Sequence, residues 1–500
     1  MYEFDGQTSA RFDAVIYFSE GNMASSESTA EADGGIELRP LVGSSSPPPS
    51  PSPRAIPRSL LPHTPVDLHP RRPLPVAVDL SDLDHTFSDH DTLLEDVELH
   101  NAGDHGHGHG HGGGPGGSTP RQTVINIFIS FVGAGMLGMP YAFSRSGWAL
   151  GVICLCAVST ANVYCMLLLV KTRRRLELNG HKNIDGYGDV GRIVLGDNGE
   201  TLVNTCLIIS QVGFATAYII FIAANITSIF SGIGRAVVCY GCVPMLSVLV
   251  QVKDMAMLSP FSLFADVANL SGTTAVFLQD FKAFSNHETI KAYDWTAFLY
   301  VTAVAIYSLE GVGMVLPLES SCAKREEFPK ILKWTVVGIT LLIASFGVAG
   351  YAAFGPHTEA PITLNVDGAV ASFVKLALCI ALYLTYPIMF YPVWLVAPLS
   401  GPFRVAAVVG TAAVAHAVPS FGKFLGLVGA SICTLLGFII PAILHIKVFH
   451  YEKGPQGDGL KKWELWLDYF FIAFGIVFGV LGTYDSFMAL INHTEGGAHR

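Results

Sequence analysis

The stretch GAGMLGMP, residues Gly133–Pro140, recurs 178 positions later as GVGMVLP, residues Gly311–Pro317. Both copies lie inside apolar segments that are long enough to cross a lipid bilayer. Glycine and proline weaken an α-helix, so the two stretches predict unwound backbone at membrane depth. Lipid cannot hydrogen-bond bare peptide groups, and such breaks therefore line a cavity enclosed by protein. Gly/Pro-interrupted segments at matching places in two halves indicate the substrate site of a membrane transporter.

Eleven apolar segments follow one another from residue 121 to residue 491, and we expect an all-α integral membrane protein. Each segment has the ~17–30 residues that a hydrocarbon core of ~30 Å requires. The expected spans are 123–144, 147–170, 200–230, 234–251, 256–280, 296–318, 331–354, 367–397, 402–418, 422–448 and 466–491. The two breaks fall in spans one and six, which cross the membrane in opposite directions. This is the arrangement that an inverted repeat requires.

The first 120 residues differ sharply from the rest and predict a disordered cytosolic tail. They hold 18 acidic residues against six arginines and are rich in Pro, Ser, Gly and His. Residues 121–491 form the expected eleven-helix transporter domain, and residues 492–500 a short luminal or extracellular tail. From residue 121 onward 24 basic residues face 22 acidic ones, so a basic nucleic-acid-binding surface is not expected.

Basic residues in the loops predict the orientation of the chain. With the amino terminus in the cytosol, sixteen Lys and Arg residues lie in cytosolic loops and six on the opposite side. An odd number of spans then places the carboxyl terminus outside the cytosol.

The glycines of the first break, Gly133, Gly135 and Gly138, allow the backbone to leave helical geometry and expose its N–H and C=O groups. A half-helix amino terminus suits a carboxylate, and a half-helix carboxyl end suits an ammonium group. An α-amino acid carries both groups on one carbon, so a pair of broken helices fits it. Small residues also permit tight helix packing, which is the structural alternative. The second copy, with Gly311 and Gly313, favours the functional interpretation.

Two carboxylates flank the second break, and a carboxylate at membrane depth is a functional candidate. Glu310 adjoins the unwound segment and is expected to gate, to pair with a substrate ammonium group or to carry a proton. Glu319 lies nearer the cytosolic end, where a solvated or salt-bridged role is the alternative. The coupling candidates are Glu310, Asp266 and His416. Asp266 is a candidate partner of Lys375, with snorkelling of the lysine as the alternative.

Two further spans carry aromatic and polar side chains at helical spacing. Weaker candidates for the lining of the cavity are Gln211, Phe214 and Tyr218 in span three and Tyr383 and Tyr386 in span eight. An aromatic stripe of this kind also serves packing between helices.

The tail carries two short motifs. Asp89, followed by Leu93 and Leu94, fits an acidic dileucine signal that a sorting adaptor would bind. Histidines alternate with glycine from residue 105 to residue 111 and raise metal transport as an alternative. No His-x-x-x-His or His-x-x-x-Asp pair occurs in a span, which disfavours a metal carrier.

At these residues the chain resembles the amino acid/auxin permease family, and most closely its vacuolar and proton-coupled amino acid transporters. The matching stretches are NIFISFVGAGMLGMPYAFSRSGWALG, YGDVGRIVLG, LSPFSLFADV, SLEGVGMVLPLES, YAAFGPHTEAPITLNV and LYLTYPIMFYPVW. The resemblance implies a LeuT-type fold, with two inverted five-helix repeats, broken helices 1 and 6 and one extra helix. It also implies that substrate binds at Gly133–Gly138, which includes Ala134, and at Ser308–Gly313. Asn126 stands where the proton-coupled branch has a histidine, and Asn cannot titrate.

We therefore expect a secondary transporter that moves small neutral amino acids by symport across a vacuolar or lysosomal membrane, with the plasma membrane as the alternative location. The expected coupling ion is the proton, and no cofactor is expected. An amino acid sensor that signals through the tail is a further alternative. No G-x-x-x-x-G-K-[ST] motif is present, so neither primary pumping nor another enzyme activity is expected.

Overall fold

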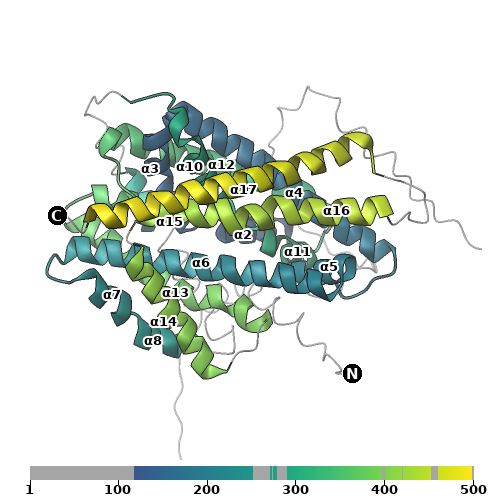
Figure 1. Cartoon of the computed structure of the whole chain (residues 1–500), viewed down its shortest axis with the longest axis horizontal. Helices are drawn as coiled ribbons and strands as arrows, with labels where there is room; N and C mark the ends of the chain where they lie inside the picture. The colour runs from purple at the N-terminus through teal and green to yellow at the C-terminus, as the bar shows by residue number, and fades with distance from the viewer. Residues whose placement is uncertain are drawn as a thin grey trace, which may run out of the picture. The chain divides into compact units, whose positions relative to one another are not determined.

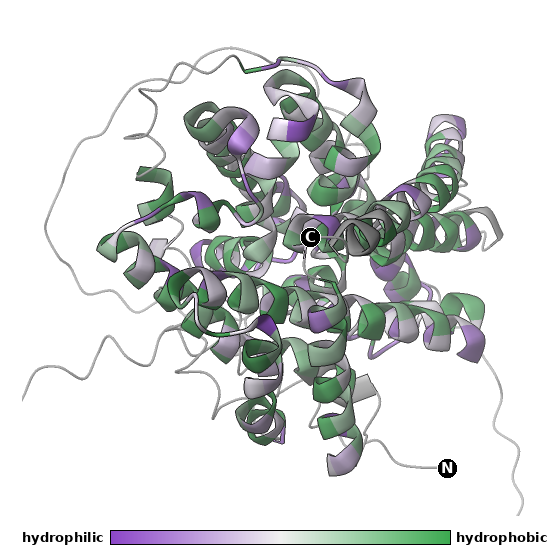
Figure 2. Ribbon diagram, turned by 60° about the vertical axis from the view of Figure 1, so that its left-hand side comes forward, coloured by the Kyte–Doolittle hydropathy of each residue, from purple (hydrophilic) through white to green (hydrophobic). Residues whose placement is uncertain are grey.

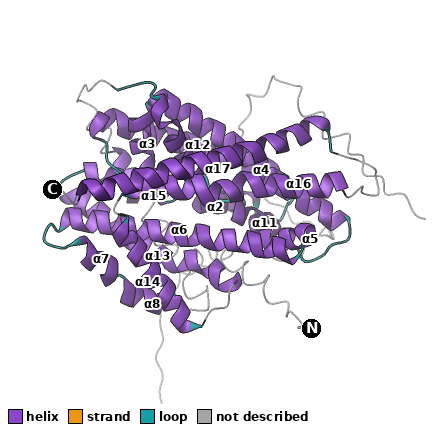
Figure 3. Ribbon diagram, in the orientation of Figure 1, coloured by secondary structure: helices purple, strands orange, loops and turns teal. Residues whose placement is uncertain are grey.

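The computed structural model describes residues 118–251, 271–272, 274–278, 290–396, 400–418, 420–451 and 460–497. Within these ranges every regular element is helical (Figure 3), apart from an isolated parallel bridge between Ser118 and Cys322. The predictions that concern the tail, including its disorder, the sorting motif and the His-Gly tract, lie outside the described residues.

Seven described helical segments are long and apolar enough to cross a membrane, and a bent pair makes an eighth. The bent pair is α2 (Pro120–Phe131) with η3 and α3 (Ala134–Ser146). The seven are Trp148–Leu178 (α4), Asp197–Ile229 (α6), Trp295–Ser321 (η4, α10 and α11), Phe328–His357 (α12 and η5), Ala369–Phe390 (in α13), Phe421–Phe449 (α15 to α16) and Lys462–Ile491 (in α17). The all-helical membrane fold is therefore confirmed, with eight of the eleven expected spans present as spanning segments.

The other three expected spans differ from this pattern. The fourth consists of two short helices, α7 (Arg235–Gly241) and α8 (Val243–Leu249), and Pro244 lies in the first turn of the second one, where proline is tolerated. The ninth is α14 (Gly401–Ala417), which has only 17 residues. Most of the fifth, including Asp266, lies outside the described residues. The count of eleven stays a prediction.

The broken spans are at the centre of the fold, and the last span is at its edge. In Trp295–Ser321, 72% of the most apolar window is buried, against 28% in Lys462–Ile491. Around the second broken span, α10 (Phe298–Ser308) packs against α4 (Trp148–Leu178), α3 (Met139–Ser146) and α15 (Phe421–Val428). Hydrophobic residues, in green, predominate along the helices in Figure 2, with hydrophilic ones interspersed, as expected where outer faces contact lipid.

Two groups of helices pack around this centre (Figure 1). On one side α6 (Asp197–Ile229) contacts α13 (Ala369–Val396), α14 and α5 (Tyr187–Leu195). On the other, α16 (Ile440–Tyr451) contacts α4 and α17 (Lys462–Gly497). Two π-helical segments, η7 (Gly429–Cys433) and η8 (Leu435–Ile439), join α15 to α16. Such wide turns inside a helix frequently mark functional sites.

Candidate substrate site at two broken helices

The first break is an interruption of the helix with a sharp change of direction. Helix α2 ends at Phe131, and Val132 and Gly133 are extended, with φ/ψ of −85°/98° and −137°/−163°. A short 3₁₀ segment, η3 (Ala134–Gly138), leads into α3, and the two halves meet at 47°. The prediction of a broken first helix is confirmed.

The second break separates α10, which ends at Ser308, from α11 (Val312–Ser321). Leu309, Glu310 and Gly311 connect the two halves without regular helical geometry. The break therefore occurs where the Gly-x-Gly sequence predicted it. The first N–H groups of α11 and the last C=O groups of α10 have no partner within their own helices.

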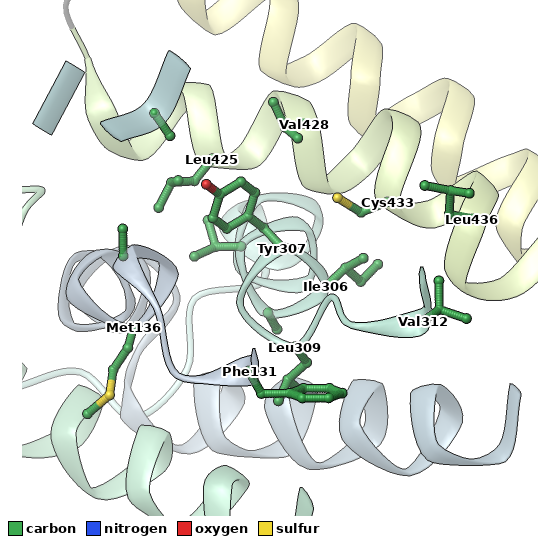
Figure 4. Close-up of a cluster of buried hydrophobic side chains, with 14 of the residues drawn as sticks. Phe131, Met136, Ile306, Tyr307, Leu309, Val312, Leu425, Val428, Cys433 and Leu436 are labelled. Atoms are coloured by element: carbon green, nitrogen blue, oxygen red, sulfur yellow. The ribbon is translucent and has the colours of Figure 1, made fainter. Parts of the chain in front are cut away.

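The two breaks are in direct contact with each other. A Cβ atom on Gly135 would lie 2.9 Å from Ser308 Oγ and 3.0 Å from Ser308 Cα. A Cβ atom on Gly311 would collide with the ring of Phe131, the last residue of α2. The structure thus brings together the two segments that the sequence placed 178 positions apart (Figure 4). It also supports the packing alternative at Gly135 and Gly311, because neither position has room for a side chain.

The other break residues differ in the space around them. A Cβ atom on Gly138 would contact Leu425, and one on Gly313 would lie 2.9 Å from Leu207 Cδ2. Ala134 is buried. Gly133 is half-buried, yet a Cβ atom there would meet no protein atom within 4 Å. Open space beside an extended, half-buried backbone is where a small ligand fits.

Two hydroxyl groups next to the contact between the breaks have no hydrogen-bond partner among the described residues, Tyr307 Oη and Ser308 Oγ. Both side chains are buried, at 5% exposure each. Figure 4 shows Tyr307 among apolar side chains that include Leu425 and Val428. Buried polar atoms are nearly always hydrogen-bonded, so two unpartnered hydroxyls beside unwound backbone indicate a site for a polar ligand. Ser308 was predicted, but Tyr307 was missed, although it directly precedes Ser308.

The second break is held open by an asparagine that the sequence analysis did not select. The side-chain amide of Asn162, in the middle of α4, donates to the backbone oxygen of Leu309. This bond satisfies one of the carbonyls that the interrupted helix leaves without a partner. In the sequence, Asn162 could have been recognised as a candidate because it is the single Asn within the apolar span two.

Glu310 lies at the break, and its carboxylate interacts with the backbone N–H of Val312, the first residue of α11. Its Oε2 atom would be 3.8 Å from a Cβ atom on Gly437, in the π-helical segment η8. None of the ion pairs found among the described residues includes Glu310. A half-buried carboxylate beside a helix break has the chemistry to bind an ammonium group.

Glu319 has a different environment, because three arginines surround its fully buried carboxylate. The distances from Oε1 are 2.7 Å to Arg174 Nε and 3.7 Å to Arg325 Nη2, and Arg173 Nη1 lies 3.5 Å from Oε2. Arg173 also donates to the backbone oxygen of Leu316. The salt-bridged alternative for Glu319 is confirmed, and the residue joins the end of α4 to the end of α11.

The span-three candidates lie beside the breaks. The ring of Phe214 packs edge-on against Tyr307, with 4.9 Å between ring centroids. Tyr218, one turn along α6, is close enough to Tyr307 to interact with it electrostatically. Gln211 is partly exposed and lies one turn before Phe214 on the same helix. Phe214 and Tyr218 are therefore placed to contact a ligand at the breaks.

The span-eight candidates are placed differently, because their hydroxyl groups bind other helices. Tyr383 Oη donates to the backbone oxygen of Cys242 at 3.2 Å, and Tyr386 Oη lies 2.6 Å from Thr411 Oγ1 on α14. Their predicted contact with substrate stays a prediction, and their visible role is to join α13 to α7, α8 and α14.

Of the remaining coupling candidates, His416 lies among the described residues and Asp266 does not. His416 is exposed in the last turn of α14, with its ring 5.7 Å from that of Tyr240. Lys375 is buried and donates to Ser228 Oγ at 3.3 Å, while its predicted partner Asp266 lies outside the described residues. Among the described residues no group of three His, Cys, Asp or Glu side chains could hold a metal ion.

Replacement of Tyr307 by Phe is expected to weaken substrate binding without weakening the fold. The hydroxyl has no partner among the described residues, so its removal breaks no bond seen there. A hydrogen bond to substrate contributes about 0.5–1.5 kcal/mol, so the KM should rise about twofold to tenfold. Uptake of labelled L-alanine into liposomes, measured against concentration, gives this KM.

Tyr300 provides a matched control, because its hydroxyl is also buried and unpartnered in the described structure and lies on the same helix. Its hydroxyl points toward Gly422 rather than toward the breaks. Tyr300→Phe should leave the KM unchanged. If Tyr307→Phe, Tyr300→Phe and the wild-type protein have equal KM values, the Tyr307 hydroxyl does not bind substrate.

Comparison with known proteins gives a consistent family match. The family model described as "Transmembrane amino acid transporter protein" matches residues 116–397 and 401–488. "Amino acid transporter AVT3B" from Arabidopsis thaliana is 37% identical over 394 residues, which cover 74% of this chain and 93% of the relative. "Vacuolar amino acid transporter 3" from Saccharomyces cerevisiae is 28% identical over 399 residues, 72% of this chain and 55% of the relative. "Proton-coupled amino acid transporter-like protein pathetic" from Drosophila melanogaster is 25% identical over 425 residues, 78% of this chain and 88% of the relative.

Proposed function

The chain belongs to the family of transmembrane amino acid transporter proteins, and from this premise we propose that it moves small neutral amino acids together with protons across a vacuolar membrane. Membership confirms the family that the sequence resembles, and it makes the chain a transporter rather than an enzyme. The observation that carries the proposal is the contact between the two breaks, beside which Tyr307 and Ser308 have unpartnered hydroxyls in the described structure.

The broken helices offer complementary charges to the two ends of an amino acid. The first N–H groups of η3 follow Gly133 and bind the α-carboxylate, aided by the partial positive charge of a helix amino terminus. The carboxylate of Glu310 and the carbonyl end of α10 bind the α-ammonium group. Asn162 keeps the second break open through its bond to Leu309.

The substrate side chain is limited in size by the residues around the breaks. Phe214 and Tyr307 pack against each other on one side, and Gly135 touches Ser308 on another. The space next to Gly133 is free of protein atoms and half-enclosed. Glu310 is the charged side chain that the described structure places at the breaks, and the α-ammonium group occupies it, so a second charge on the substrate is left without a partner. A small neutral side chain fits this site best.

A vacuolar location is supported by the yeast relative, whose name describes a vacuolar transporter. Proton coupling is supported by the relative from Drosophila, whose name describes a protein like the proton-coupled transporters. The dileucine motif at Asp89, Leu93 and Leu94 would bind the sorting adaptor that delivers the chain to this membrane.

Uptake into liposomes tests the proposal. The purified full-length chain is reconstituted, and each of the twenty labelled amino acids is added with and without a pH gradient across the membrane. Small neutral amino acids should enter, and the gradient should increase their accumulation. No uptake of any of the twenty would contradict the function, whereas uptake that ignores the gradient would contradict only proton coupling.

A further inference from the structure

A histidine and an aspartate make a buried contact between the last two membrane-spanning segments. His445 of α16 and Asp468 of α17 approach to 2.7 Å between Nδ1 and Oδ2, with side-chain exposures of 1% and 0%. Ionisable side chains inside a membrane are costly, and they commonly mark ion or proton pathways. The substrate site described above does not use this pair.

The pair has hydrogen-bonding capacity left over. The second carboxylate oxygen of Asp468, Oδ1, is buried and has no partner among the described residues, and the same holds for the hydroxyl of Tyr164 on α4. Tyr164 is near enough to interact electrostatically with Asp468. A buried pair with a purely structural role is expected to be fully hydrogen-bonded. An unused donor and an unused acceptor that are near enough to interact electrostatically instead suit a site that gains and loses a proton.

Other titratable groups around the pair come from each helix that packs against it. Lys171 of α4 and Glu464 of α17 form their own ion pair at 3.3 Å and together add no net charge. Helix α4 also contributes Tyr164, Cys165 and Arg175, and α16 contributes Lys447. Helix α5 contributes Tyr187, whose hydroxyl donates to the Leu436 carbonyl. The arginine lies over the ring of Phe449, which in turn contacts His445.

Two elements that touch the second break also touch this pair. On α4, Asn162 donates to Leu309 at the break, and Tyr164 follows two residues later. On span ten, Gly437 lies beside Glu310, and His445 follows eight residues later, about 12 Å along a helix. Aromatic stacking joins the elements further, because Phe471 of α17 stacks on Tyr164 and on Phe438 of η8.

We propose that His445 and Asp468 form the proton-binding site that couples proton movement to amino acid movement. This inference rests on the proposed function as a transporter. When the Nδ1–H of neutral His445 donates to ionised Asp468, the pair carries one negative charge. A proton that binds to Nε2 makes the pair neutral, and its release to the other side restores the charge, so only this N–H bond forms and breaks.

The charge of the pair matters because it is buried. An uncompensated negative charge that is buried in protein is costly, and protonation removes that cost. The two charge states therefore favour different positions of α16 relative to α4 and α17, and α4 contacts the second break directly through Asn162. This site supplies the titratable group that Asn126 cannot provide.

Two assays on the full-length chain in liposomes test the assignment. The first measures accumulation of labelled L-alanine driven by a pH gradient, with a pH-sensitive dye inside the liposomes. The second measures exchange of labelled for unlabelled L-alanine without a gradient. Asp468→Asn and His445→Gln should lower gradient-driven uptake at least tenfold and abolish the dye response, while exchange stays within threefold of wild type. Asp485→Asn, an exposed aspartate on the same helix, should change neither assay.

Tyr164→Phe gives a milder test that a structural role would not reproduce. In this proposal the Tyr164 hydroxyl, which has no partner in the described structure, turns to Asp468 Oδ1 when the carboxylate is ionised and stabilises the charged form, so its removal favours proton uptake. The pH of half-maximal L-alanine uptake should therefore shift to higher values, with the maximal rate within about twofold of wild type.

Several outcomes overturn the assignment. Gradient-driven uptake that survives in both Asp468→Asn and His445→Gln would exclude the pair as the coupling site. If both variants lose exchange together with gradient-driven uptake, the pair stabilises the fold and does not couple protons to transport. If the wild-type protein takes up L-alanine without a dye response, it transports amino acids without moving protons, and the proposed proton site is excluded. Absence of both uptake and exchange in the wild-type protein would contradict the proposed function itself.

Discussion

Replacement of Glu310 by Gln is expected to raise the KM for L-alanine between about tenfold and a hundredfold. A hydrogen bond to a charged partner contributes about 1.5–3 kcal/mol, and each 1.36 kcal/mol corresponds to a factor of ten. Gln keeps the shape of the side chain and an oxygen that accepts from the Val312 N–H, so the second break should remain intact. Concentration-dependent uptake of labelled L-alanine measures the effect.

Glu326→Gln is the matched control, because this exposed glutamate loses the same charge away from the breaks. Its KM should equal that of the wild-type protein. A KM for Glu310→Gln within twofold of wild type would remove the carboxylate from substrate binding. An unchanged KM with a lost response to the pH gradient would instead assign the transported proton to Glu310.

Replacement of Glu319 by Ala is expected to cost the most stability of any single change at the end of α11. The carboxylate is fully buried, and Arg173, its most buried partner, has a side chain only 6% exposed. Removal of one member of a buried ion pair costs about 3–5 kcal/mol, because the remaining charge is left without compensation. Arg174 and Arg325 are 35% and 38% exposed, so solvent screens part of the effect and we expect the lower end of this range.

Thermal unfolding of the detergent-solubilised protein measures this loss as a lower apparent melting temperature. Glu327→Ala is the control, since Glu327 forms an exposed pair with Lys324 at 3.0 Å. An exposed pair of this kind contributes about 0–1 kcal/mol, so the control should melt close to the wild-type temperature. Equal melting temperatures for the two variants would show that the arginine cluster does not stabilise the fold.

The sequence was sufficient to predict the breaks because their cause is local. Glycine and proline weaken a helix wherever it lies, and the repeated pattern located Gly133 and Gly311 to within a residue or two of the observed interruptions. The position of Glu310 beside the second break also followed from its place in the chain. The contact between Gly135 and Ser308 required only that the two broken spans meet, as an inverted repeat implies.

The parts that the sequence did not predict depend on which face each helix turns toward its neighbours. Asn162 and Tyr307 each lie in a mainly apolar stretch of their helix, and only the packing of α4 on α10 shows that they adjoin the break. Tyr383 and Tyr386 have the composition of a cavity wall, but α13 directs their hydroxyls to Cys242 and Thr411. His445 and its partner Asp468 lie in different spans, and no sequence spacing connects them.

The central claim is that substrate binds at the two breaks, in the open space beside Gly133, and binding of labelled L-alanine to the purified protein tests it most directly. Gly133→Val places a side chain where no protein atom lies within 4 Å, and the extended backbone there accepts valine. Gly338→Val adds the same side chain at an exposed position on α12 with equally open space. We predict that Gly133→Val lowers the affinity for L-alanine at least tenfold but unfolds at the same melting temperature as the wild-type protein. Gly338→Val should bind L-alanine with the wild-type affinity. Unchanged affinity in folded Gly133→Val would contradict a substrate site at the breaks.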